Sequence, residues 1–105
     1  NVAVGAYIEA VKVPEGARIL GGFIAFEAMS TAGGDASVQI GIDGTDSKYL
    51  GTVSVDAAGK TNFADTIALN YGEALTAEAV IRLKVITEAW LAAKKIAGHV
   101  DYMVD

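Results

Sequence analysis

The stretch SVQIGIDGTDSKYL, from Ser37 to Leu50, decides the fold class of this chain. Valine and isoleucine alternate with small or polar residues over Ser37–Asp43, and a period of two is typical of a strand with one buried face. The Asp43-Gly44 pair then predicts a hairpin corner, because glycine tolerates a positive φ and aspartate bonds to the turn backbone. We therefore expect a strand, a corner, and a second strand over Tyr49–Val55.

Similar alternation recurs on both sides of this stretch, and turn-forming residues separate the segments at intervals of roughly 10–13 residues. This spacing is typical of antiparallel sandwiches and barrels. The sequence therefore predicts an all-β fold of antiparallel strands, arranged as a sandwich or a barrel. The Gly21-Gly22 pair predicts a bulge or a close backbone approach within one of them. The other expected strands are Tyr7–Val13, Arg18–Ala28, Asn62–Leu69, Ala79–Thr87 and Ile96–Val104.

One region supports two interpretations. Much of Ala74–Ala97 has high helix propensity, but the β-branched alternation over Val80–Thr87 favours a strand. A short helix near Glu88–Lys95 stays open as an alternative. Trp90, beside Leu91, either plugs the end of the sandwich or inserts into a neighbouring subunit, where tryptophan is enriched at association hot spots.

Composition sets further bounds on the function. A chain of 105 residues with 52% hydrophobic and 20% charged residues predicts one folded domain. It has no cysteine, which excludes disulfides and thiolate metal sites in this chain. The net charge is −5 and the basic residues are scattered, so we expect no binding to nucleic acid. No apolar run reaches about 18 residues, so we expect no membrane-spanning segment.

The residues that are candidates for chemistry are few. Asp43 and Asp46 lie three apart beside a glycine, but the distal acid of a calcium loop is missing and Lys48 adds positive charge, so a structural corner is preferred over an ion site. His99, the single histidine, is interpreted as a polar surface residue, with a charge switch at a subunit contact as the minor alternative. Nucleophile-elbow and Walker motifs are absent from the sequence. We expect no catalytic, cofactor-binding or metal site, no cofactor, and no enzymatic activity.

Several stretches combine into a longer pattern: VPEGARILGGFIAFEAM over Val13–Met29, SVQIGIDGTDSKYLGTVSVDAAGKT over Ser37–Thr61, and the strands Val80–Val85 and Val100–Val104. The pattern resembles a group of small virion proteins of tailed bacteriophages, of the capsid decoration or head-associated jelly-roll type. It covers most of the chain from about Glu9 onward, and the Trp90–Lys95 segment departs from it. The matching residues are Pro14, Gly16, Ala17, Arg18, Leu20, Gly22, Gly41, Asp43, Gly44, Asp46, Lys48, Tyr49 and Leu50.

The resemblance implies an antiparallel β-sandwich of jelly-roll type with about eight strands. It also implies a structural virion protein, a capsid decoration or cementing protein that binds the major capsid protein on the outer surface of a phage head and stabilises it. It also implies a homotrimer, a place on the capsid surface of the virion, and assembly in the host cytoplasm. Asp46 is expected to pair with Lys48 or Arg18. Residues 1–6 would form an N-terminal arm and residues 7–105 a single β-sandwich domain. The candidate interface residues are Asn1, Val2, Val4, Trp90 and Leu91.

Two other classes of function compete with this one. A receptor- or carbohydrate-binding module of a phage fibre or tail is the alternative, because jelly-roll folds host many lectins. It predicts aromatic side chains grouped in loops, where the sequence places Tyr71 and Trp90. A cupin-type enzyme requires several histidine and glutamate ligands, and a single histidine argues against it.

Overall fold

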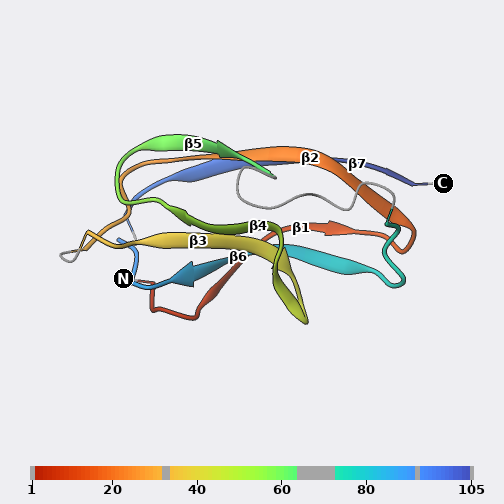
Figure 1. Cartoon of the computed structure of the whole chain (residues 1–105), viewed down its shortest axis with the longest axis horizontal. Helices are drawn as coiled ribbons and strands as arrows, with labels where there is room; N and C mark the ends of the chain where they lie inside the picture. The colour runs from red at the N-terminus through yellow and green to blue at the C-terminus, as the bar shows by residue number, and fades with distance from the viewer. Residues whose placement is uncertain (1, 32–33, 64–72, 92, 105) are drawn as a thin grey trace.

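The computed structural model describes residues 2–31, 34–63, 73–91 and 93–104. These residues form two antiparallel sheets packed face to face, one with the strand order β1-β6-β3-β4 and one with the order β5-β2-β7 (Figure 1). The predicted all-β antiparallel sandwich is confirmed, with seven strands in the described residues where the sequence predicts about eight. The strands are β1 (Tyr7–Val13), β2 (Ala17–Phe26), β3 (Ser37–Ile42), β4 (Thr45–Ser54), β5 (Gly59–Asn62), β6 (Ala79–Ile86) and β7 (Ile96–Val104).

The β3–β4 hairpin forms where the sequence predicts the corner. Ile42 pairs with Thr45, and Gly44 takes a φ of 88°, the left-handed conformation that glycine adopts without a Cβ penalty. The second strand of the hairpin therefore begins at Thr45, four residues before the predicted start at Tyr49. The prediction was wrong there because polar residues hide the start of β4 from a search for apolar alternation. Most of the expected strand over Asn62–Leu69 lies outside the described residues.

The core lies between the two sheets and is built from the inward row of each strand. On β6 every second residue is buried, which confirms the predicted alternation of this strand. Burying such side chains supplies the main favourable term in folding. Within the described residues no helix is long and apolar enough to cross a membrane. The inward rows include Val38 and Ile40 of β3, Ile81, Leu83 and Val85 of β6, and Ile19, Ile24 and Phe26 of β2.

Trp90 lies in an isolated β-bridge between bends and turns, so the helix considered for Glu88–Lys95 is wrong for its described part. Trp90 forms isolated antiparallel bridges with Val2 and Ser30. Its backbone N–H donates to the carbonyl of Val2 at 2.9 Å, and the Leu91 N–H donates to the carbonyl of Met29 at 3.0 Å. These backbone groups therefore find partners far away in sequence, and helix propensity in this segment yields to tertiary contacts.

The glycine pair of β2 produces both features that the sequence left open. The pairing of β2 with β7 shifts register between Ile19 and Gly21, which marks a bulge. At Gly22 a Cβ would lie 2.4 Å from the carbonyl oxygen of His99, so the two backbones approach closely. Glycine is required there because any side chain would collide with backbone atoms that have little freedom to move.

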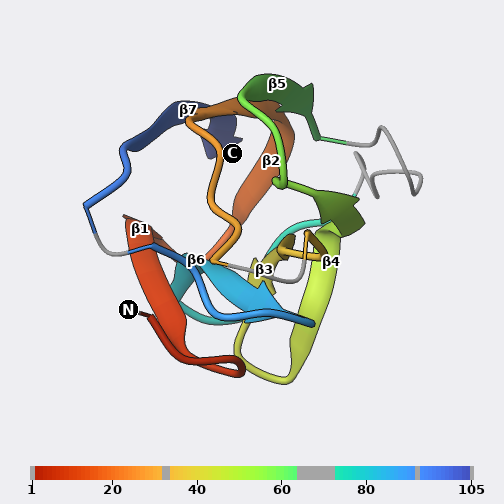
Figure 2. The ribbon, with the colours of Figure 1, turned by 90° about the vertical axis from the view of Figure 1, so that its left-hand side faces the viewer.

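The two sheets expose edge strands on the same side of the molecule. β1 ends the larger sheet and β7 ends the smaller one, and Figure 2 shows both along one side of the sandwich, away from β4 and β5. The segment before β1 lies against its own chain. Gly5 donates to the carbonyl of Val85 at 2.8 Å, and the Val85 N–H donates to Ala6 at 2.9 Å.

Candidate functional site

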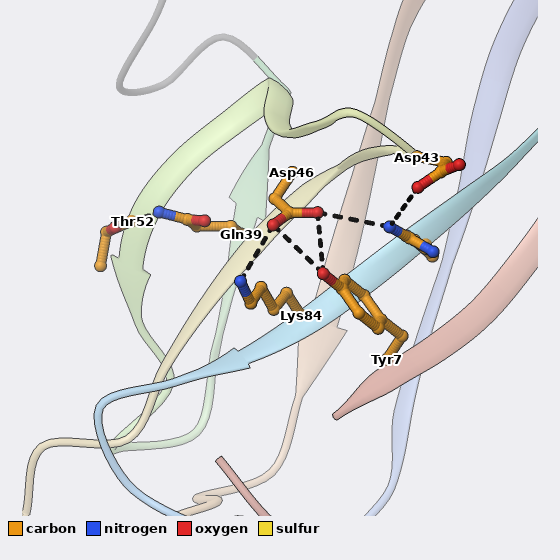
Figure 3. Close-up of polar contacts among 7 residues, drawn as sticks. Tyr7, Gln39, Asp43, Asp46, Thr52 and Lys84 are labelled. Carbon is orange, nitrogen blue, oxygen red and sulfur yellow. Dashed lines mark hydrogen bonds and ion pairs between the residues drawn. The ribbon is translucent and has the colours of Figure 1, made fainter. Parts of the chain in front are cut away.

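A polar cluster covers the outer face of the larger sheet (Figure 3). We call it the Asp46 cluster, and it consists of Tyr7 from β1, Asp43 from the corner, Asp46 from β4, and Arg82 and Lys84 from β6. Since Ile81, Leu83 and Val85 point into the core, the alternation of β6 turns Arg82 and Lys84 outward. The cluster joins three strands of one sheet through side chains.

Gly41 of β3 allows Asp46 of β4 to reach across β3 to β6. Gly41 pairs with Arg82 of β6, so it lies between Asp46 and the basic residues of the cluster. The backbone of β4 folds directly over it: a Cβ at Gly41 would lie 2.1 Å from the carbonyl oxygen of Thr45 and 2.6 Å from that of Asp46. The missing side chain therefore makes room for the backbone that carries the Asp46 carboxylate toward β6.

Both carboxylate oxygens of Asp46 are bonded to positive or hydroxyl groups. Lys84 Nζ lies 2.9 Å from one oxygen, and Arg82 Nη2 lies 3.4 Å from the other. The Tyr7 hydroxyl donates to the same carboxylate at 3.1 and 3.2 Å, and the Arg82 guanidinium lies 3.7 Å from the centre of the Tyr7 ring. The outer face of the sheet is thus held by a charge-assisted network with stacking below it.

The charges of this network reinforce each other. The hydrogen bond from Lys84 lowers the pKa of Asp46 below its ordinary 3.8, against the opposing effect of burial. The same hydrogen bond raises the pKa of Lys84 above its ordinary 10.5. Both groups are therefore charged across the neutral range, and neither is poised to exchange a proton there, as general acid–base catalysis requires.

The structural reading of the corner is the one that this geometry favours. Arg82 and Lys84 each contact one oxygen of the Asp46 carboxylate, which leaves fewer of its lone pairs for a cation. The partners expected for Asp46 were wrong. Lys48 pairs instead with Glu73 at 2.6 Å, and Arg18 belongs to β2 in the other sheet. The polar row of β6 was the signal that sequence reasoning missed.

We expect Asp46→Asn to flatten the acid side of the stability profile. Because the pKa of Asp46 is lowered in the folded state, its contribution is fully present above the unfolded pKa and is lost as the pH falls through the folded one. Unfolding by urea at a series of pH values from about 6 to 2 measures this slope. The variant should lose stability less steeply with acid than the unmodified chain.

Asp43→Asn is the matched control for this experiment. The Asp43 side chain is 99% exposed and reaches Arg82 at 3.5 Å, and ion pairs in such a position contribute little to stability. The control should reproduce the unmodified profile. An unchanged acid slope in Asp46→Asn would show that the cluster does not tie the sheet together through this carboxylate.

The residues expected at an interface lie in different surroundings. Asn1 lies outside the described residues. Val2 is half-buried in its bridge to Trp90, Leu91 is half-buried beside it, and the Val4 side chain is 55% exposed. Trp90 is only 1% exposed and donates its indole N–H to the carbonyl of Ser37 at 3.2 Å, so it occupies the core of its own chain. The structure thus groups Val2, Trp90 and Leu91, with Val4 at the surface nearby in sequence.

His99 lies on the exposed outer face of β7, as the sequence predicts. Its ring meets the ring of Phe23 edge-on at 4.4 Å, and its Nε2 atom lies 3.5 Å from the Asp101 carboxylate. Tyr71, which the carbohydrate-binding alternative places in a loop, lies outside the described residues.

An apolar pocket of about 440 Å³ opens between the edge strands β1 and β7. Its walls include Ile8 and Val11 of β1 and Ile96 and Val100 of β7, and its floor includes Leu83. The pocket marks the side on which the two sheets are least covered. Pockets of this size commonly receive apolar groups, from a ligand or from another chain.

Comparison with known proteins identifies the fold. No protein-family model matches the chain, and no curated protein matches its sequence. A chain from the capsid of Ralstonia phage GP4 has a similar structure, with a TM-score of 0.79 and 18% identity, over 98% of this chain and 76% of that one. A chain from the capsid asymmetric unit of cyanophage Pam1 has a TM-score of 0.74 and 18% identity, over 100% of this chain and 77% of that one. At this level of identity, the likeness shows that the three chains share a fold.

Proposed function

We propose that this protein is a structural component of a tailed-phage capsid, and that it acts there as a decoration or cementing protein on the outer surface of the head. The observation that carries the proposal is the likeness over the whole chain to two chains that come from phage capsids. The match of motifs such as Gly41, Asp43, Gly44 and Asp46 to small phage virion proteins points the same way. The partner in this proposal is the major capsid protein, and the location is the virion.

The chemistry of the described residues supports a structural role. The Asp46 cluster pairs its carboxylate with Lys84 and Arg82 and braces three strands, which serves the stability of a module rather than turnover of a substrate. A cementing protein needs a stable β module and an exposed contact surface, and it needs no active site.

The contact surface in this proposal is the N-terminal arm together with the residues that hold it. Val4 is the most exposed large apolar side chain in the described part of the chain, and Leu91 is half-buried near the same segment. Trp90 is buried, so its part is to fix the arm through its two hydrogen bonds with Val2. The trimer expected from the resemblance belongs to the same proposal, since capsid proteins assemble with closed symmetry.

The test is addition of the purified protein to capsids from a phage strain that lacks it. We expect saturable, stoichiometric binding, and light scattering of the free protein at low concentration should report the mass of a trimer. Val4→Asp should weaken capsid binding about tenfold or more, because a carboxylate buried at a contact without a partner costs more than about 1.4 kcal/mol. Leu20→Asp, which changes an exposed apolar residue on β2, is the control with the same charge change.

The outcomes separate the two candidate functions. If the protein does not bind capsids even when it is added in large molar excess, the cementing proposal is wrong. Binding to a glycan array in its place would support a receptor- or carbohydrate-binding module. Capsid binding that is equally weakened by both variants would place the contact elsewhere than on the arm.

A further inference from the structure

β7 is a sheet edge without the usual protection against pairing. It is nine residues long, contains neither proline nor lysine, and within the described residues pairs only with β2. β1, the other edge on this side, is interrupted by a bulge between Glu9 and Val11 and carries Lys12. Natural proteins protect exposed edges with such bulges and lysines. Apart from the single charge of Asp101, β7 therefore has little to prevent another strand from pairing with it.

The sequence of β7, IAGHVDYMV, is complementary to itself when reversed about Val100. In an antiparallel pair with a two-fold axis at Val100, a residue before Val100 lies opposite the residue of the second copy that is equally far after Val100. His99 then lies opposite Asp101 of the second copy, and each small residue lies opposite a large one. The opposite pairs, with the residue of the second copy given last, are Ile96 and Val104, Ala97 and Met103, Gly98 and Tyr102, His99 and Asp101, and Val100 and Val100.

We propose that β7 pairs antiparallel with β7 of a second copy of this chain across a two-fold axis at Val100, which joins two three-stranded sheets into one continuous sheet. The match between His99 and Asp101 sets the register. The two side chains lie 3.5 Å apart within one chain, and the pairing places Asp101 of the second copy opposite His99 and His99 of the second copy opposite Asp101. An imidazole opposite a carboxylate can donate a hydrogen bond to it, whereas a slip by two residues would set two Asp101 carboxylates or two His99 side chains directly opposite each other.

The pairing also covers the apolar surface that β7 leaves exposed. Tyr102, Met103 and Val104 are 42%, 47% and 48% exposed. In the proposed register these side chains meet Gly98, Ala97 and Ile96 of the second copy, whose small or apolar side chains leave room for them. Val100 lines the pocket between β1 and β7 and lies on the proposed axis, so the second copy would also shield that pocket.

This inference stands apart from the proposed function. It rests on the edge, sequence and charges of β7, whereas the capsid proposal rests on the likeness of the fold. A two-fold contact differs from the three-fold contact of a trimer, and where both form, the β7 contact would join neighbouring trimers. Failure of either proposal therefore leaves the other intact.

A cysteine at Val100 tests the axis directly, because the chain has no cysteine of its own. Residues directly opposite each other in an antiparallel pair have Cα atoms about 4.5–5.5 Å apart, within the range that a disulfide spans. We expect Val100→Cys to form a covalent dimer in a glutathione redox buffer, seen on a non-reducing gel. Ala97→Cys is the control, because position 97 of one copy lies far along the strand from position 97 of the other. In the double variant Ala97→Cys with Met103→Cys, each new thiol lies opposite one of the second copy, so the cross-link should return.

The axis is wrong if Val100→Cys forms no more covalent dimer than Ala97→Cys while both variants keep the melting temperature of the unmodified chain. If Val100→Cys does not fold, the double variant Ala97→Cys with Met103→Cys decides the question alone. The absence of a cross-link there would overturn the proposal.

Exchange of the charges tests the register. His99→Asp places carboxylates opposite each other twice in the dimer and should weaken self-association about tenfold, measured by sedimentation over a range of concentrations. The exchange variant, His99→Asp with Asp101→His, again places an imidazole opposite each carboxylate in the same register and should return to within about threefold of the unmodified chain. Self-association that the single variant leaves unchanged, or that the exchange does not recover, would contradict this register.

Discussion

Replacement of Trp90 with alanine is expected to lower the free energy of unfolding by about 3–5 kcal/mol, the largest loss from any single side chain here. Trp90 is 1% exposed, fills the end of the core, and bonds its indole N–H to the carbonyl of Ser37. Its removal leaves a large cavity and takes away the hydrogen bond to the Ser37 carbonyl, and both add to the cost. Denaturant unfolding followed by circular dichroism measures the change.

Trp90→Phe and Leu91→Ala are the matched variants for this experiment. Trp90→Phe keeps most of the buried ring and loses the bond to Ser37, for an expected cost of about 1–2 kcal/mol. Leu91→Ala truncates the half-buried neighbour and should cost less than Trp90→Ala. If Trp90→Ala keeps the denaturant midpoint of the unmodified chain and only weakens its association, Trp90 serves contact with another subunit.

Replacement of Gly41 with alanine is expected to cost roughly 3 kcal/mol or more, because the added methyl group has no space to enter. A Cβ there would lie 2.1 Å from the carbonyl oxygen of Thr45 and 2.6 Å from two backbone atoms of Asp46. These are backbone atoms of the adjacent strand, so relief requires that β3 and β4 separate. Separation would also move the Asp46 carboxylate away from Arg82 and Lys84. The measurement is the denaturant midpoint and its dependence on pH.

Gly21→Ala is the control for this change. Gly21 also lies within a strand, but a Cβ there would meet nothing within 4 Å. Its replacement should change stability by less than about 0.5 kcal/mol. If Gly41→Ala were as stable as Gly21→Ala, the close packing of Thr45 over Gly41 would be refuted, and so would the account of how Asp46 reaches β6.

The strands were the most predictable part of this protein. The bounds of β1 and β7 match the predicted Tyr7–Val13 and Ile96–Val104, and β6 ends within one residue of its prediction. A strand with one buried face must alternate, so its pattern is visible in a single sequence. The start of β4 was missed because Thr45, Asp46, Ser47 and Lys48 are all polar, and the pairing with β3 is irregular over this part, with a register shift between Ile40 and Ile42.

The candidate site was predictable only in part. The Gly41–Asp46 stretch was correctly interpreted as a corner, since the turn chemistry of Asp43 and Gly44 is local. The partners of Asp46 come from 36 and 38 residues further along the chain, and the Tyr7 hydroxyl comes from 39 residues before it. Such pairs depend on the order of strands within a sheet, which alternation does not reveal.

By itself, the sequence determined the fold class, the corner at Asp43-Gly44, and the inward and outward rows of its strands, because each depends on residues close together in the chain. The tertiary structure decided that Trp90 belongs to the core, that Asp46 binds Arg82 and Lys84, and that β7 lies at an open edge. These outcomes depend on which strands become neighbours. The free energy that selects neighbours comes from burial and pairing over the whole chain, and no short stretch of residues contains it.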